Sequence, residues 1–220
     1  MTHDLFATGD RPRVTVGYID GRIPYFAVDG IFRDPVAVRE AALALPYSEG
    51  TAHYPGRVAR FPPGHPSLTG FLQKVVSLVS RDYLSCMPAL PDGGKPTRLR
   101  GVDTDFAITD VPPDQLSPEQ RKPHIDAVPV FGLIYLNEEP RGGTLFFKPK
   151  TATPPAIERT GYPTRSDEEL EVSGKIEGRF NRLAIYPGFI LHSAEIEGEW
   201  IESDERRQKP RLTQRLMFFF

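Results

Sequence analysis

Residues 131–147, FGLIYLNEEPRGGTLFF, contain two apolar runs separated by a polar turn with two consecutive glycines. Short runs rich in aliphatic and aromatic residues and bounded by Gly and Pro are typical of β-strands. Several strands with uneven, Pro- and Gly-rich connections indicate a sandwich or a jelly roll. The sequence therefore predicts a mainly β core, with strands at residues 100–108, 131–137, 144–147, 182–186, 190–195 and 211–219.

The N-terminal part of the chain has a different pattern. Two β-like runs, 14–19 and 23–28, flank Asp20-Gly21, a pair that favours a hairpin turn. Asp34-Pro35 has the residue types of a helix start, and an apolar stripe predicts a second helix over residues 66–83. We expect one domain over 1–220, in which residues 1–98 supply a hairpin and helices packed on one sheet of an α+β fold. Residues 99–220 then form the β core, a double-stranded β-helix or jelly roll.

Composition excludes several classes of protein. The 220 residues include 39% hydrophobic and 25% charged residues, with 23 prolines and 19 glycines, values that suit one globular domain with many turns. Cys86 is the only cysteine, so the sequence offers neither an internal disulfide nor a thiolate metal cluster. The N-terminus does not resemble a signal peptide and no apolar run is long enough to span a membrane, so we expect a cytoplasmic protein without a membrane partner.

Charge gives no sign of a nucleic-acid partner. The net charge is −2 and the isoelectric point is near 6.2, so the chain lacks the net positive charge that would attract a phosphate backbone. One basic cluster exists near the C-terminus, but acidic residues lie beside it, which favours a solvated loop before the last strand. The cluster consists of Arg206, Arg207, Lys209 and Arg211.

The segment Pro123-His124-Ile125-Asp126 is the strongest candidate for a metal site. In an extended chain, residues two apart project from the same face, so the His124 imidazole and the Asp126 carboxylate can bind one ion. His192 follows a turn within a β-rich region and could supply a second imidazole. Two histidines and one carboxylate on one face leave positions open for other ligands, as in non-haem Fe(II) oxygenases. A His-x-Asp pair alone is common in solvated turns, so the hypothesis depends on its context.

That context is an ordered set of motifs. His124-Ile125-Asp126 is followed by the Tyr-Leu-Asn strand end at 135–137 and the Gly-Gly-Thr-Leu strand start at 142–145. Residues 181–188, NRLAIYPG, then lead to His192, and Arg211-Leu212-Thr213 comes last. Over roughly residues 99–220 this order resembles the 2-oxoglutarate/Fe(II)-dependent dioxygenases of the prolyl-hydroxylase type, in a bacterial-type subfamily. The resemblance implies that His124, Asp126 and His192 bind Fe(II) and form the catalytic centre.

The resemblance also implies residues that bind the cosubstrate. Arg211 and Thr213 match the family's Arg-x-Ser/Thr motif, and an arginine fork suits the far carboxylate of 2-oxoglutarate. Period-2 alternation places Arg215 on the same strand face, so a shifted alignment would make Arg215 the binding residue. Tyr135 matches a tyrosine that donates to the same carboxylate, although a core aromatic residue accounts for it equally well. We expect Gly142-Gly143 to form only a tight turn.

Other residues have simpler interpretations. His3, His53 and His65 lie in a terminus and in Pro- and Gly-rich loops, where no ligand role is expected. The segment Tyr54-Pro55-Gly56-Arg57 could contact an acidic or zwitterionic substrate, but a structural turn is favoured.

The activity implied by the resemblance is oxidation of a substrate C–H bond by O₂, with 2-oxoglutarate converted to succinate and CO₂. Hydroxylation is the default outcome, and desaturation or ring closure uses the same centre. We expect a small-molecule substrate, such as an amino acid or a biosynthetic intermediate, ahead of a peptidyl side chain, and a homodimer remains open. The alternatives are a cupin-like metal-binding protein and an iron oxygenase that does not use 2-oxoglutarate.

Overall fold

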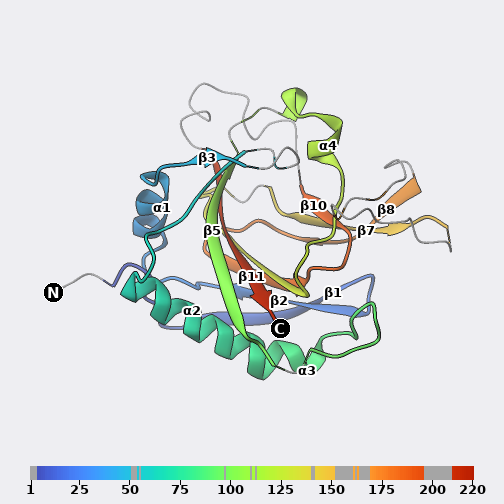
Figure 1. Ribbon diagram of the computed structural model, residues 1–220, viewed down its shortest axis with the longest axis horizontal. Helices are drawn as coiled ribbons and strands as arrows, with labels where there is room; N and C mark the ends of the chain where they lie inside the picture. Colours follow the sequence, from blue (N-terminus) through green and yellow to red (C-terminus); the bar gives the residue numbers. More distant parts are fainter. Residues whose placement is uncertain are drawn as a thin grey trace.

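Two antiparallel β-sheets and a layer of helices form the fold in the computed structural model (Figure 1). Helices α1 (Pro35–Leu43) and α2 (Pro66–Leu78) cover one face of the larger sheet, while the smaller sheet packs on its other face. The structure describes residues 4–50, 54, 56–96, 98–109, 111, 113–139, 142–151, 161, 163, 169–195 and 210–220.

The larger sheet has the strand order β1-β2-β9-β6-β11-β5-β4-β3, and the smaller sheet has the order β10-β7-β8. Every paired strand runs antiparallel to its neighbours. The N-terminal strands therefore extend the same sheet that the C-terminal strands form. The strands of the larger sheet are β1 (Arg13–Ile19), β2 (Ile23–Asp29), β3 (Ser48–Glu49), β4 (Arg57–Ala59), β5 (Gly101–Thr109), β6 (Val130–Tyr135), β9 (Arg182–Pro187) and β11 (Arg211–Phe219), and those of the smaller are β7 (Thr144–Pro149), β8 (Leu170–Ile176) and β10 (His192–Ala194).

The predicted hairpin is confirmed by the pairing of β1 with β2. Ile19 pairs with Ile23, and the loop between them has positive φ at Asp20 (51°) and Gly21 (68°). Two consecutive positive φ angles are typical of the tight turn whose twist matches that of the flanking strands.

Both predicted helices are also confirmed. Asp34 Oδ1 accepts a hydrogen bond of 3.0 Å from Ala37 N, so Asp34 caps α1 as its sequence suggests. Helix α2 continues into a π-helical turn, Val79–Tyr83, and the short helix α3 (Leu84–Cys86). None of the described helices is long and apolar enough to cross a membrane.

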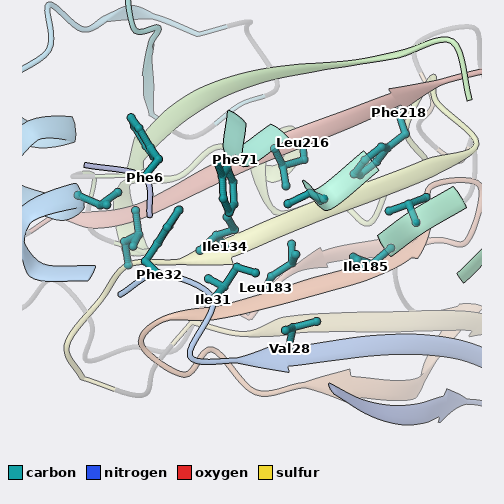
Figure 2. Close-up of a cluster of buried hydrophobic side chains, with 14 of the residues drawn as sticks. Phe6, Val28, Ile31, Phe32, Phe71, Ile134, Leu183, Ile185, Leu216 and Phe218 are labelled. Atoms are coloured by element: carbon teal, nitrogen blue, oxygen red, sulfur yellow. The ribbon is translucent and has the colours of Figure 1, made fainter. Parts of the chain in front are cut away.

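The main hydrophobic core lies between the helices and the larger sheet. Alternate residues of the central strands project into it, including Ile134 of β6, Ile185 of β9 and Leu216 of β11. Figure 2 shows these side chains with Phe71 of α2 and with Phe6 and Phe32, which come from the segments flanking the hairpin. This packing fixes the central strands from one side.

The intervening residues of the same strands face the smaller sheet. Phe131, Leu133 and Tyr135 of β6 and Tyr186 of β9 form a second buried cluster with Phe146 of β7. Strands β6 and β9 are buried along their whole lengths because both of their faces are covered. The site described below lies at the edge of this second cluster.

The mainly β fold with flanking helices agrees with the prediction, and the differences concern short or polar elements. Strands β3 and β4 are two and three residues long, and β8 carries exposed Glu171 and Val172 and a central Gly174. Helix α4 (Pro118–Arg121), a single turn shortly before His124, is not among the helices that the sequence predicts. Such elements lack the long apolar periodicity that made the others predictable.

Candidate metal centre and cosubstrate cavity

A β-bridge between His124 and His192 is the foundation of the site. Each residue donates its backbone N–H to the other's carbonyl at 2.9 Å, which joins the segment before β6 to the start of β10. The two imidazole rings consequently lie side by side, with centroids 4.6 Å apart. His192 is buried, whereas His124 is half-buried at the cavity wall.

Asp126 is placed beside the two histidines by its own backbone contacts. Its N–H donates to Gly188 O at 2.8 Å, and Gly188 N donates to Pro129 O at 3.0 Å. A Cβ at Gly188 would stand 2.2 Å from Val128 O and 3.2 Å from Asp126 Cβ. Only glycine allows the turn after β9 to approach the Asp126 segment this closely.

The three side chains converge. His192 Nε2 lies 3.2 Å from Asp126 Oδ2, and His124 Nε2 lies 3.9 Å from Asp126 Oδ1. One potential ligand atom from each residue falls within 4.8 Å of the others. Nitrogen and oxygen donors at these separations can bind one divalent transition-metal ion.

The hydrogen bonds around the triad fit a metal ion. His192 Nδ1 donates to Ile190 O at 2.8 Å, which leaves Nε2 as the lone-pair atom of the neutral ring. This Nε2 faces Asp126 Oδ2, which is buried and accepts no hydrogen bond from any described residue. Two lone-pair atoms that face each other in a buried site repel unless a proton or a metal ion lies between them, and a metal ion would take the place of the proton that His192 Nε2 shares with Asp126. The donor set therefore matches the iron that the resemblance implies.

The pKa values of the triad follow from burial and mutual charge. Burial, together with the neighbouring His192, lowers the pKa of His124 to about 4, so its ring is neutral near pH 7. Burial alone would raise the pKa of Asp126, but the two imidazoles outweigh it and the pKa is lowered. Burial opposes protonation of His192, yet the Asp126 carboxylate raises its pKa overall. An ionised carboxylate and neutral imidazoles are the forms that bind metals, so a metal ion that binds here displaces the proton that Asp126 favours on His192.

A cavity of about 230 Å³ opens beside the triad. The face of β11 that carries alternate residues forms one wall of it, as the period-2 pattern predicted. This face brings two guanidinium groups into the same cavity as the triad. The cavity lining includes His124, Asp126, His192, Arg211, Thr213, Arg215 and Met217.

Arg211 lies at the first position of β11 and is buried. Its Nε and Nη2 donate to Gly142 O at 3.1 and 2.9 Å, so the Gly-Gly turn holds the guanidinium in place. Leu212, the next residue, donates its N–H to Asn137 Oδ1 at 2.7 Å. The end of β6 and the turn before β7 thus jointly position Arg211.

Tyr135 is close to the cavity but does not line it. Its hydroxyl shares a hydrogen bond of 2.7 Å with Thr144 Oγ1, and Thr144 does line the cavity. Burial raises the pKa of Tyr135 to about 12, so the phenol stays protonated and can donate. Thr144 was not predicted as a site residue, although its place after the Gly-Gly turn makes it the first inward-facing residue of β7.

Arg215 has a different environment from Arg211. Its Nε and Nη2 donate to the two carboxylate oxygens of Asp105 at 2.6 and 2.8 Å. Asp105 is directly opposite Arg215 in the register of β5 and β11. The Tyr54 ring lies over the guanidinium, with 5.0 Å from Arg215 Cζ to the ring centroid, and it also lines the cavity. The sequence offered no means of pairing Asp105 with Arg215, because their register depends on the tertiary fold.

The remaining candidates lie away from this centre or outside the described residues. His65 accepts from Leu68 N through Nδ1 and caps α2, a structural role. The predictions for His3, His53 and most of the basic cluster before β11 fall outside the described residues, whereas Arg211, its last member, is buried.

Comparison with solved structures shows a shared fold. The chain is similar to the non-heme alpha ketoglutarate dependent epimerase SnoN from nogalamycin biosynthesis, with a TM-score of 0.53 and 18% identity over 90% of this chain and 79% of SnoN. SnoN in complex with Fe3+, alpha ketoglutarate and nogalamycin RO gives the same score and coverage at 17% identity. HygX from Streptomyces hygroscopicus, with nickel, 2-oxoglutarate and hygromycin B bound, scores 0.45 at 13% identity over 89% of this chain and 82% of HygX. The likeness to SnoN supports the predicted jelly-roll core.

Sequence comparison is informative at the level of a family. No curated protein matches the chain. The family of unknown function DUF6445 matches residues 10–158 and 150–219, which together include every residue of the triad and of the β11 cavity wall. The chain belongs to the DUF6445 family.

Proposed function

We propose that this protein is a 2-oxoglutarate/Fe(II)-dependent dioxygenase in which His124, Asp126 and His192 bind the iron. The observation that carries the proposal is the convergence of one potential ligand atom from each of these three residues, all within 4.8 Å of one another, in the wall of one cavity. When bound, Fe(II) would supply the activation of O₂ that oxidises a C–H bond while 2-oxoglutarate is decarboxylated to succinate and CO₂.

Arg211 is the residue that we assign to the far carboxylate of 2-oxoglutarate. The Nε and Nη2 atoms of Arg211 donate to the neutral carbonyl of Gly142, whereas the same edge of Arg215 is engaged by the Asp105 carboxylate and only Nη1 and part of Nη2 are left over. A guanidinium on a backbone carbonyl can exchange that contact for a charged one, which is roughly twice as strong. Thr213 and Thr144 line the same cavity, and their hydroxyl groups can donate hydrogen bonds to the same carboxylate of 2-oxoglutarate.

The cavity walls have a second role, which is to exclude water from the reacting centre. Phe131, Leu133 and Met217 line the cavity beside the triad and offer no hydrogen bonds to water. A dry cavity strengthens the electrostatic contacts of Arg211 and suppresses side reactions. The default outcome that we propose is hydroxylation of a small molecule, with a peptidyl side chain as the second choice. SnoN, which shares the fold, is described as an epimerase, so the outcome of the oxidation needs its own assay.

Equilibrium dialysis under anaerobic conditions tests this function. We expect the wild-type protein to bind one 2-oxoglutarate per chain when Fe(II) is present, and neither Asp126→Ala nor metal-free protein to do so. Metal binding without any 2-oxoglutarate binding would contradict the proposal and favour a cupin-like metal protein or an oxygenase of another kind.

A further inference from the structure

Arg215 presents unused hydrogen-bond donors to the cavity. Two of its five N–H groups bind Asp105, and no described residue accepts a hydrogen bond from Nη1. Arg60, whose Nη2 lies 3.9 Å from Asp105 Oδ2, has its own two-point partner in Asp103, so Asp105 pairs mainly with Arg215. The two-point contact of Asp105 uses one edge of the Arg215 fork and fixes the direction in which the free Nη1 points.

Tyr54 contributes a second unused polar group beside Arg215. Its ring packs over the guanidinium, and its hydroxyl oxygen is buried without a hydrogen-bond partner among the described residues. An unpaired buried hydroxyl destabilises a fold, so such a group in a cavity wall is expected to have a partner in another state of the protein. Tyr54 lies between β3 and β4, far in sequence from the triad, and lines the same cavity as His192.

Metal and cosubstrate do not account for these donors. The +2 charge of Fe(II) cancels the −2 charge of 2-oxoglutarate. The negative charge of Asp126 likewise cancels the positive charge of Arg211. Arg215 is then the remaining cation among the described residues that line the cavity. Its neighbours along the wall, Met217 and Phe131, are apolar. A ligand suited to this part of the cavity has an acceptor group at one end and an apolar body.

We propose that Arg215 and Tyr54 bind a carboxylate of the substrate, and hold it so that the apolar part of the molecule lies beside the metal centre. The inference rests on the proposed function, since it assigns to the substrate the part of the cavity that iron and 2-oxoglutarate do not fill. Arg Nη1 and a tyrosine hydroxyl both donate, and a carboxylate accepts both hydrogen bonds with charge assistance. The substrate class is therefore a small carboxylic acid, and an uncharged amide of the same shape binds poorly.

Calorimetric titration of the full chain tests the inference. The protein is loaded anaerobically with Fe(II) and excess 2-oxoglutarate, and the probes are the matched pairs benzoate and benzamide, and hexanoate and hexanamide. We expect the carboxylates to bind and the amides to bind at least about tenfold more weakly, a ratio that one charge-assisted hydrogen bond provides. The visible band of the iron–2-oxoglutarate chelate is monitored throughout, to verify that the probe does not displace the cosubstrate.

Tyr54→Phe is the most informative variant, because the hydroxyl that it removes makes no hydrogen bond to a described residue. We expect it to melt at the wild-type temperature or above and to lose carboxylate affinity several-fold. Tyr47→Phe is the matched control: its hydroxyl is also buried without a hydrogen-bond partner in the described part of the chain, but Tyr47 does not line the cavity, so carboxylate affinity should not change. The double variant Asp105→Asn/Arg215→Gln removes the guanidinium without leaving a buried carboxylate unpaired.

Three results would overturn the inference. In the first, the wild-type protein forms the chelate band but binds no carboxylate probe, or binds amide and carboxylate equally. This result would show that the cavity has no carboxylate site. Loss of 2-oxoglutarate affinity in Asp105→Asn/Arg215→Gln, to the extent seen in Arg211→Gln, would assign Arg215 to the cosubstrate and leave the proposed function intact. Failure to form the chelate band before any probe is added would overturn the proposed function and the inference together, and so is distinguishable from the other two.

Discussion

His124 and His192 are joined by two reciprocal backbone hydrogen bonds of 2.9 Å, so their imidazoles are held together by the backbone and not by side-chain packing alone. Removing an imidazole should therefore abolish metal binding while leaving the bridge intact.

His192→Ala and Asp126→Asn should both lose the stabilisation that divalent metal gives the wild-type protein. At a metal concentration about 100-fold above the Kd, that stabilisation amounts to about 2.7 kcal/mol. Without metal, Asp126→Asn should lower the free energy of unfolding by about 1.5–3 kcal/mol, because the charged contact between Asp126 and His192 is lost. Thermal unfolding with Mn²⁺ or with a chelator measures both effects. Equal metal stabilisation in wild type and Asp126→Asn would show that the ion binds elsewhere.

Arg211→Gln should weaken 2-oxoglutarate binding by about 10- to 100-fold, the effect of losing a charge-assisted two-point contact, while metal affinity stays near the wild-type value. Arg179→Gln is a suitable control, because Arg179 is an exposed residue paired with Glu177. Dialysis of the two variants against labelled 2-oxoglutarate measures the difference. If Arg211→Gln binds the cosubstrate as wild type does, Arg211 has been assigned wrongly.

Asn137→Ala should weaken 2-oxoglutarate binding indirectly. Asn137 Oδ1 accepts from Leu212 N at 2.7 Å and so sets the position of the residue next to Arg211. We expect a loss of about 1–2 kcal/mol in the free energy of unfolding, because a buried backbone donor loses its acceptor, and a loss of cosubstrate affinity smaller than that in Arg211→Gln. Asn137→Asp, which retains an acceptor oxygen, should recover part of the affinity. Affinity that is unchanged in Asn137→Ala would rule out this positioning role.

Gly188→Ala should damage the metal centre without altering any ligand. The new methyl group would meet Val128 O at 2.2 Å, so the Asp126 segment must shift. We expect metal affinity to fall about tenfold or more, since ligand positions tolerate little displacement. Gly70→Ala is the control, because a Cβ there meets no atom within 4 Å. Metal titrations that give equal affinities for both variants would contradict this role of Gly188.

Acid should weaken the hairpin's attachment to the core. Asp29 of β2 forms a two-point ion pair with Arg182 of β9, at 2.6 and 2.9 Å, and this hydrogen bonding lowers the pKa of Asp29. A depressed carboxyl pKa contributes stability that is complete above the unfolded-state value near 3.8 and is lost as pH falls through the folded-state value. Asp29→Asn should cost about 2 kcal/mol at pH 7 and less below pH about 4. Urea unfolding across this range measures the effect, and a pH-independent difference would contradict it.

Sequence patterns were sufficient where local chemistry determines the structure. The Asp20-Gly21 turn, the Asp34 cap and the alternation along β11 each depend on neighbouring residues, and each was predicted correctly. The spacing of His124 and Asp126 likewise placed both side chains in one cavity.

Contacts between distant residues could not be predicted from such patterns. The partnership of Arg215 with Asp105 depends on strand register, and the position of Tyr54 over Arg215 depends on how residues far apart in sequence are brought together by the fold. The sequence around Tyr54 is compatible with a substrate contact but favours a structural turn. No local signal distinguishes these two roles. The role of Thr144 also emerges only when β7 faces Tyr135.

The most direct test of the central claim is the visible spectrum of the full chain after anaerobic addition of Fe(II) and 2-oxoglutarate. A chelated 2-keto acid gives a weak metal-to-ligand charge-transfer band. The account predicts this band in the wild-type protein and its loss in His124→Ala, with both proteins folded. A folded wild-type protein that shows no band at saturating Fe(II) and 2-oxoglutarate would contradict it.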